Sequence, residues 1–183
     1  VGNSPTMRAA MDMVKRAADS DLNVLITGET GTGKELFALS IHLNGRRSQD
    51  NFVVVDCTAL PETLVESILF GHSKGAFTGA DKAQDGLIRQ AHRGTLFLDE
   101  MGELPLPLQK TFLRVLQEHR FRPVGGQKEA ESDFRLISAT NKNLEQMVAE
   151  GKFRGDLLYR LGAMTIHLPP LRQHPEDIRD MAV

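Results

Sequence analysis

The sequence predicts an α/β domain in which helices cover both faces of a mostly parallel sheet. Short apolar runs rich in β-branched residues alternate with segments of helical periodicity along the 183 residues. Strands separated by helices need crossover connections, and such connections favour parallel pairing with both faces of the sheet buried. Apolar residues make up 40% of the chain, which is enough for a core of this kind at this length.

Each expected strand is a short apolar run bounded by glycine, proline or polar residues. The expected strands are Asn23–Thr27, Phe52–Asp56, Thr95–Asp99, Phe134–Thr140 and Thr165–Leu168. The segment 71–86 interrupts this pattern, because it is rich in glycine and lacks periodicity. We therefore expect a loop or paired turns inserted there, and a second turn at Gly125-Gly126.

The expected helices have apolar residues at helical spacing and carry start or stop signals. They are Pro5 to about Ala18, Lys34–Leu43, Pro61–Phe70, Leu87–His92, Pro107–Glu118, a helix after Asn143 that reaches Ala149, and Asp156–Leu161. Ser4 followed by Pro5 is typical of a helix N-cap with proline at the first helical position. Asn143 with Gln146 three residues later resembles a capping box.

Composition and charge exclude several classes of protein. The 22 Lys and Arg residues are balanced by 24 Asp and Glu residues, so the chain lacks the overall positive charge that favours duplex DNA. Cys57 is the only cysteine, which excludes an internal disulfide framework and a zinc site built from several cysteines. No apolar run is long enough to span a bilayer, and the first residues do not resemble a signal peptide. We therefore expect a cytoplasmic enzyme or regulator without membrane contact.

Residues 28–34 have the pattern of a phosphate-binding loop, G-x4-G-K, between an expected strand and an expected helix. In this context backbone N–H groups converge on phosphate oxygens, and the helix dipole and Lys34 add positive charge. The residues expected to bind ATP are Gly28, Glu29, Thr30, Gly31, Thr32, Gly33, Lys34 and Glu35. Glu35 stands where the general motif has Ser or Thr as a Mg²⁺ ligand, so Mg²⁺ must rely on other groups and water. The alternative is a glycine-rich turn without a ligand.

Asp99 and Glu100 follow an apolar strand, and the C-terminal edge of a parallel sheet would place them beside the phosphate loop. Asp99 suits a ligand to Mg²⁺ or to its waters. Glu100 suits a group that polarises the water attacking a γ-phosphate. Acidic pairs are also common as solvated strand ends, and the phosphate loop is what favours the catalytic interpretation.

Further motifs occur together with this pair. Residues 75–80 have the sequence GAFTGA, and six fixed residues would occur by chance in about one in 10⁵ chains of this length. The accompanying motifs are GETGTGKE at 28–35, GTLFLDE at 94–100, ATN at 139–141, FRGDLLYRL at 153–161 and LPPLR at 168–172. In these motifs, and from Val1-Gly2 to its end, the chain resembles the AAA+ ATPase domain of bacterial enhancer-binding proteins, the activators of sigma-54 RNA polymerase.

The resemblance implies a P-loop AAA+ fold with an inserted GAFTGA loop, and ATPase activity with ATP and Mg²⁺ in a hexameric or heptameric ring. Residues 1–170 would form the α/β ATPase subdomain and residues 171–183 the start of a helical lid that is largely absent. Pro175-Glu176-Asp177 resembles a helix start so close to Val183 that we expect a piece of a longer chain. The implied partner is the sigma-54 RNA polymerase holoenzyme, with promoter and enhancer DNA bound through domains outside these residues.

The same resemblance assigns roles to individual residues. The loop expected to contact sigma-54, mainly through its Phe and Thr, consists of Gly75, Ala76, Phe77, Thr78, Gly79 and Ala80. An aromatic side chain at a glycine-bounded tip suits an interaction handle, and burial of Phe77 in the core is the alternative. Asn141 matches the family's first sensor of the γ-phosphate, with a turn-forming asparagine as the alternative. Arg154 and Arg160 match arginines that reach the ATP of a neighbouring subunit, with two solvated helix arginines as the alternative.

Two positions depart from the family pattern. Asp56 stands where the family usually has an Asn that hydrogen-bonds the catalytic glutamate as a switch, and an ionised Asp cannot donate to Glu100 and would repel it. Ile68 replaces a common acidic residue, which would alter how the loop latches at rest.

Three functions remain open: an ATP-driven remodeller of closed sigma-54 polymerase complexes, a regulatory module that binds nucleotide without remodelling, and an unrelated AAA+ machine. The intact Phe77-Thr78 favours the first, Asp56 favours the second, and the third would lack GAFTGA.

Overall fold

The computed structural model describes residues 4–173 of the chain. Its centre is a five-stranded sheet in the order β2-β5-β8-β1-β9. The strands are β1 (Val24–Thr27), β2 (Phe52–Asp56), β5 (Thr95–Asp99), β8 (Arg135–Thr140) and β9 (Met164–His167). Every pair of neighbouring strands is parallel, which confirms the predicted class.

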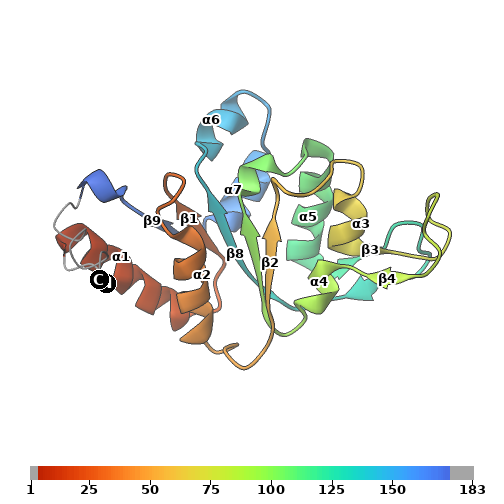
Figure 1. Cartoon of the computed structure of the whole chain (residues 1–183), viewed down its shortest axis with the longest axis horizontal. Helices are drawn as coiled ribbons and strands as arrows, with labels where there is room; N and C mark the ends of the chain where they lie inside the picture. The colour runs from red at the N-terminus through yellow and green to blue at the C-terminus, as the bar shows by residue number, and fades with distance from the viewer. Residues whose placement is uncertain (1–3, 174–183) are drawn as a thin grey trace.

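Helices cover both faces of this sheet (Figure 1). The first layer consists of α1 (Pro5–Ala18) and α2 (Lys34–Leu43). The second layer consists of α3 (Val65–Phe70), α4 (Leu87–Gln90), α5 (Leu106–Glu118), α6 (Leu144–Ala149) and α7 (Gly155–Leu161). Successive strand residues alternate between the two layers: Val24 and Ile26 pack with α1 and α2, whereas Leu25 packs in the opposite core.

Two predicted helix starts are confirmed by their caps. The Ser4 hydroxyl accepts a hydrogen bond from the backbone N–H of Met7 at 3.3 Å, with Pro5 at the first position of α1. At α6 the Asn143 side chain accepts from the backbone N–H of Gln146 at 3.0 Å. The Gln146 side chain donates to Glu150 and does not reach back, so only one half of the capping box forms.

The helix expected over Leu87–His92 ends two residues early, at Gln90. Two other segments differ more from the prediction. The helix expected from Pro61 begins at Val65, because residues 61–64 form a turn in which the Pro61 carbonyl accepts from the N–H groups of both Leu64 and Val65. The turn expected at 125–126 lies inside a hairpin formed by β6 (Arg120–Phe121) and β7 (Ala130–Glu131). Strands of two residues carry too little periodicity to be predicted.

The inserted segment 71–86 is a loop closed at its base by a second short antiparallel pair, β3 (Gly71–His72) and β4 (Gln84–Asp85). Figure 1 shows this loop and the β6–β7 loop lying side by side where they project from the sheet. Short 3₁₀ turns complete the fold: η1 (Met101–Glu103) after β5, and η2 (Leu171–Gln173) after β9.

No helix within residues 4–173 is long and apolar enough to cross a membrane. The helix start expected at Pro175-Glu176-Asp177, and with it most of the expected lid, lies outside the described residues. The division into an ATPase subdomain and a lid therefore stays a prediction.

Candidate functional site

The phosphate loop occupies the predicted place, between the end of β1 and the start of α2. Gly31 and Gly33 both adopt a φ of +83°, a conformation that L side chains rarely adopt, and this curls the backbone. The N–H of Gly28 donates to the carbonyl of Thr140 at 3.3 Å, which ties the loop to β8. The Lys34 side chain is only 6% exposed, and its ammonium donates to the carbonyls of Gly28 and Glu29 at 3.2 Å each.

Glu100 lies beside this lysine, as the sequence predicts. Its Oε1 is 3.5 Å from the Lys34 Nζ, and its side chain is 17% exposed. The backbone of Glu100 has a φ of +50°, a left-handed conformation that costs a residue other than glycine about 1–2 kcal/mol. Such strain is found preferentially at functional positions, where the surrounding fold holds it in place.

Asn141 connects the catalytic glutamate candidate to the phosphate loop. Its backbone N–H donates to Glu100 Oε2 at 3.2 Å, and its side-chain amide donates to the Thr30 hydroxyl at 3.0 Å. The first-sensor candidate, the acidic candidate and the loop thus meet at the C-terminal edge of adjacent strands, which is where parallel α/β sheets bind ligands. The sequence did not indicate the contact with Thr30.

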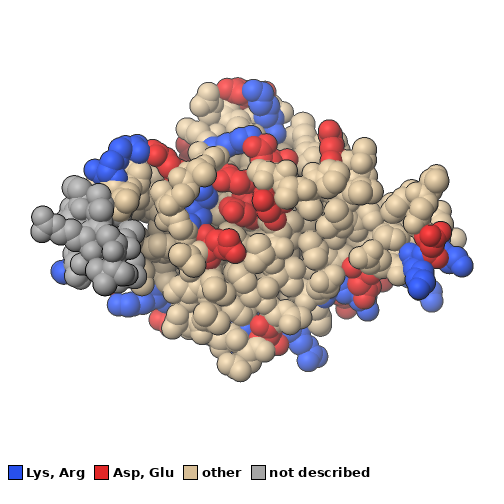
Figure 2. Space-filling model, in the orientation of Figure 1, with Lys and Arg blue, Asp and Glu red and all other residues tan. Residues whose placement is uncertain are grey.

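Asp99 ends β5 and is half-buried, with its Oδ1 accepting the N–H of Glu100 at 3.0 Å. Burial raises the pKa of Asp99 above its ordinary value, and the negative charges of Glu100 and Asp56 act in the same direction. Figure 2 shows acidic side chains gathered over this edge of the sheet, where the register places Asp56 beside Asp99. An accumulation of negative charge at a partly buried edge suits a divalent cation.

The side chains at this edge of the sheet fit Mg²⁺ only if phosphate oxygens and water supply its other ligands. Within residues 4–173, no group of three or more His, Cys, Asp or Glu side chains could hold a metal ion by itself. Glu35 is exposed on α2, and Asp99 is the carboxylate at the strand end. Mg²⁺ commonly keeps several waters and takes one or two carboxylates plus substrate phosphates, and this arrangement offers that coordination.

Asp56 has local hydrogen-bond donors in Thr58. Its Oδ1 accepts from the Thr58 N–H at 2.9 Å and from the Thr58 hydroxyl at 2.7 Å. The hydrogen bond from the Thr58 hydroxyl, assisted by backbone N–H groups, lowers the pKa of Asp56. No hydrogen bond joins Asp56 to Glu100 in the described part of the chain, and the effect of Asp56 on the switch stays a prediction.

One contact of the phosphate loop was missed by the sequence. Arg172, in η2, forms two hydrogen bonds with the Glu29 carboxylate, from Nη1 to Oε2 at 2.6 Å and from Nη2 to Oε1 at 2.5 Å. The hydrogen bond from Arg172 lowers the pKa of Glu29. Only the match to LPPLR marked this arginine in the sequence, and nothing there indicated its partner.

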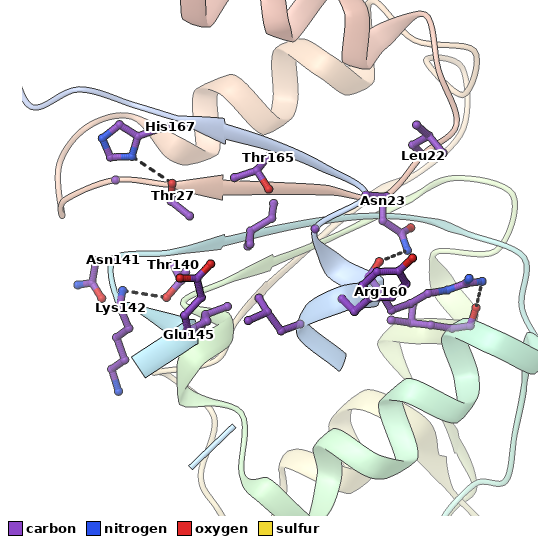
Figure 3. Close-up of a pocket in the computed structure, with 18 of the residues that line it drawn as sticks. Leu22, Asn23, Thr27, Thr140, Asn141, Lys142, Glu145, Arg160, Thr165 and His167 are labelled. Atoms are coloured by element: carbon purple, nitrogen blue, oxygen red, sulfur yellow. Dashed lines mark hydrogen bonds between the residues drawn. The ribbon is translucent and has the colours of Figure 1, made fainter. Parts of the chain in front are cut away.

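A groove of about 1070 Å³ runs across the sheet face beside α6 and α7. Figure 3 shows Thr140 and Asn141 at one end and Asn23 and Arg160 at the other. The Arg160 guanidinium donates to the carbonyl of Leu116 at 3.2 Å. Arg160 is therefore held at the opposite end of the groove from its own phosphate loop.

Arg154 is also engaged away from the loop. Its Nε and Nη2 form a two-pronged pair with the Asp156 carboxylate at 3.0 and 2.7 Å, and its side chain is 38% exposed. In the described part of the chain neither Arg154 nor Arg160 has a hydrogen bond to the phosphate loop of the same subunit.

The GAFTGA segment forms a closed loop, with the N–H of Gly75 donating to the carbonyl of Ala80 at 2.8 Å. Phe77 is 38% exposed and sets its ring edge-on against His72, with ring centroids 5.0 Å apart. It is therefore neither free nor part of the core. Of its neighbours in the segment, Thr78 is exposed and Ala80 is buried.

The β6–β7 loop supports the GAFTGA loop from one side. The N–H of Ser73 donates to the carbonyl of Val124 at 3.0 Å, and the N–H of Val124 donates to the carbonyl of Gly71 at 2.9 Å. Gly125 lies so close to Ala76 that a Cβ on the glycine would be 2.8 Å from the Ala76 Cβ. The two loops are thus in direct contact.

Comparison with known proteins identifies the family. The model of the sigma-54 interaction domain matches residues 1–167. The regulatory protein AtoC of Escherichia coli is 52% identical over 180 residues, which cover 98% of this chain and 39% of AtoC. NtrX from Brucella abortus, solved in complex with ATP, superposes with a TM-score of 0.91 at 37% identity, over 99% of this chain and 41% of that one. The chain thus spans less than half the length of these relatives.

A fourth similarity concerns the fold alone. The P-loop NTPase domain of a sigma-54 transport activator from Escherichia coli has a TM-score of 0.61 at 22% identity, over 90% of this chain and 97% of that one. With the phosphate loop and the sheet order, this similarity shows that the chain has a P-loop AAA+ fold. The match to the family model and the identity to AtoC show that the chain belongs to the family of sigma-54 interaction domains of transcriptional activators.

Proposed function

We propose that this chain is the ATP-hydrolysing module with which a transcriptional activator remodels the closed promoter complex of sigma-54 RNA polymerase. The observation that carries the proposal is that two separate groups of residues in one domain suit hydrolysis and partner contact. Lys34, Glu100 and Asn141 form a connected polar cluster at the sheet edge, whereas Phe77 is presented on a separate projecting loop. Nothing in the chemistry of Phe77 assists phosphoryl transfer.

ATP would bind with its phosphates in the loop 28–34. The ammonium of Lys34 would exchange the carbonyls of Gly28 and Glu29 for β- and γ-phosphate oxygens, adding a compact charge to the N–H groups of the loop. Asp99 would hold Mg²⁺, partly through water, and the ion would neutralise charge on the phosphates.

Glu100 would polarise the water that attacks the γ-phosphate in line. The N–H of Asn141 fixes one oxygen of this carboxylate, and the Asn141 side chain reaches the phosphate loop through Thr30. Asn141 would therefore report the presence of the γ-phosphate to the catalytic carboxylate. Asp56, whose pKa is lowered by the hydrogen bond from Thr58, would act on Glu100 only through its charge or through water.

Completion of the site would require a ring. Arg154 and Arg160 have their hydrogen bonds away from the phosphate loop of their own subunit, which supports a role on the ATP of a neighbouring one. Charge supplied in trans in this way is worth about 10³–10⁵ in rate in other nucleotide hydrolases. An isolated subunit would accordingly hydrolyse ATP slowly.

A second function is favoured by Asp56 alone. A module that binds nucleotide and regulates without remodelling would need no switch between position 56 and Glu100, and Asp56 is paired with Thr58. Hydrolysis measured with and without core sigma-54 separates the two functions, because stimulation or inhibition by sigma-54 is expected only of the remodeller.

The direct test is Phe77→Ala in the natural full-length protein. The variant should keep ATP binding and most hydrolysis, and lose capture of sigma-54 in the presence of an aluminium-fluoride nucleotide complex. Leu43→Ala removes another exposed apolar side chain, at the end of α2, and serves as the control that should still capture sigma-54. Capture by Phe77→Ala at the level of the natural protein would refute the assigned role of the loop.

A further inference from the structure

Gln109 is a polar side chain on α5 with no exposure to solvent. Its Nε2 donates to the carbonyl of Leu104 at 2.9 Å and to the carbonyl of Lys152 at 3.3 Å. Its Oε1 accepts from the backbone N–H of Arg154 at 2.9 Å. Both donors of the amide and one lone pair of its oxygen are thus engaged by backbone groups.

These three partners belong to two different parts of the candidate site. Leu104 ends the turn η1, which begins directly after Glu100. Lys152 and Arg154 belong to the connection between α6 and α7, in which Arg154 is the N-cap residue of α7 without a side-chain cap of its own. The Gln109 amide therefore joins the turn that follows Glu100 to the backbone of Arg154.

We infer that Gln109 is a positioning residue for Arg154. Gln109 fixes the backbone position from which the Arg154 side chain extends toward the ATP of a neighbouring subunit. The inference rests on the proposed function, because it requires Arg154 to act in trans. Phe153 is buried on one side of Arg154 and Leu157 on the other, so the core sets the general path of the chain. The hydrogen bond from Arg154 to Gln109 sets the backbone position between these two anchors.

The physical consequence follows from the geometry of transfer reactions. When a charged side chain that stabilises a transition state is misplaced by roughly 1 Å, the reaction can slow by about 10²-fold. The pair with Asp156 does not prevent such a shift, because Asp156 lies two residues away on the same helix and would move with Arg154. An anchor outside α7 is needed, and Gln109 on α5 supplies one.

The first measurement is the steady-state hydrolysis of ATP by Gln109→Met, made in the natural full-length protein. Methionine has a similar volume and no amide, so all three hydrogen bonds are lost. We expect kcat to fall by about 10²-fold while KM for ATP stays within roughly twofold, since the phosphate loop of the same subunit is untouched. Ser132→Ala, which removes the buried hydrogen bond from Ser132 to the Ile88 carbonyl far along the chain from α7, is the control and should leave kcat within roughly twofold.

The second measurement distinguishes action in trans from action on Glu100 in the same subunit. Rings are mixed from equal amounts of Gln109→Met and Lys34→Ala subunits, each nearly inactive alone. In a random ring about a quarter of the sites combine an intact phosphate loop with a neighbour that carries a correctly placed Arg154. We therefore expect about a quarter of the natural activity. Activity no higher than that of the separate variants would overturn the inference, since it would mean that Gln109 acts through Leu104 on its own subunit.

A parallel mixture separates this outcome from failure of the proposed function. Arg154→Ala mixed with Lys34→Ala should recover activity by the same arithmetic, and its failure to do so would overturn both the trans role of Arg154 and the inference that depends on it.

Amide hydrogen exchange in the natural protein needs no variant. The Arg154 N–H should exchange slowly because Gln109 holds it, and exchange as fast as in an unstructured peptide would refute the positioning role.

Discussion

Gly125→Ala would test whether the β6–β7 loop determines the resting place of Phe77. Gly125 has a φ of +68°, and a methyl group there would be 2.8 Å from the Ala76 Cβ and 3.0 Å from the Ala76 Cα. Optimal carbon–carbon separations are about 3.5–4.0 Å, so the methyl group and Ala76 cannot keep their present positions. Either the β6–β7 loop yields or the GAFTGA loop moves.

The magnitudes indicate that the loop moves. Overpacking of this kind costs about 1–3 kcal/mol, whereas the edge-on contact of Phe77 with His72 contributes only about 0.5–1.5 kcal/mol. Lifting the loop away is therefore the less costly response, and an excess of about 1.4 kcal/mol would shift the resting population tenfold. The left-handed backbone adds a further 1–2 kcal/mol or so to the cost of the substitution itself.

The control and the assay follow from the same structure. Gly151 has a φ of +72° and nothing within 4 Å of an added Cβ, so Gly151→Ala carries the backbone cost without the collision. The chain contains no tryptophan, so Phe77→Trp gives a single fluorescent reporter of the loop. In that background Gly125→Ala should shift the emission to the red, and Gly151→Ala should not. Identical emission spectra for the two variants would show that the contact with Ala76 does not hold the loop.

The remaining predictions concern residues at this edge of the sheet. Lys34→Ala should abolish ATP binding in equilibrium dialysis. Glu100→Gln should still bind ATP and should not turn it over. Equal loss of binding and turnover in Glu100→Gln would mean that Glu100 is needed for folding or for the metal. Asp56→Asn should change the hydrolysis rate and its response to sigma-54. Because Thr58 lowers the folded pKa of Asp56, the stability from this hydrogen bond should be present at neutral pH and be lost as the pH falls through the lowered value, which urea unfolding at several pH values can measure. Burial raises the pKa of Cys57 to about 12, so alkylation at pH 8 should be about 10³-fold slower in the folded chain than in urea, and comparable rates would contradict this burial.

The sheet could be predicted to within a residue because its central strands β1, β5 and β8 are buried on both faces. Such strands appear in the sequence as apolar runs, and their parallel order brings the residues after β1, β5 and β8 to one edge. Lys34, Glu100 and Asn141 meet there for this reason, as expected. The roles assigned to them, and to the arginines and the GAFTGA loop, stay predictions.

The contacts that the sequence could not indicate join side chains far apart along the chain. The hydrogen bond between Gln109 and Arg154 spans 45 residues, and no local pattern encodes it. The contact between His72 and Phe77 depends on the path of the inserted loop. The β6–β7 hairpin was missed because each of its strands has two residues. Tertiary placement, rather than propensity, decides all three.

The pair between Glu29 and Arg172 has a consequence for how this sequence can change over time. The two residues are 143 positions apart, yet their charges form one unit with two hydrogen bonds. Loss of either charge alone would leave the other without its partner at the mouth of the phosphate loop, whereas loss of both together would not. Among homologous sequences, substitutions at position 29 should therefore be accompanied by substitutions at position 172, so that the two positions covary.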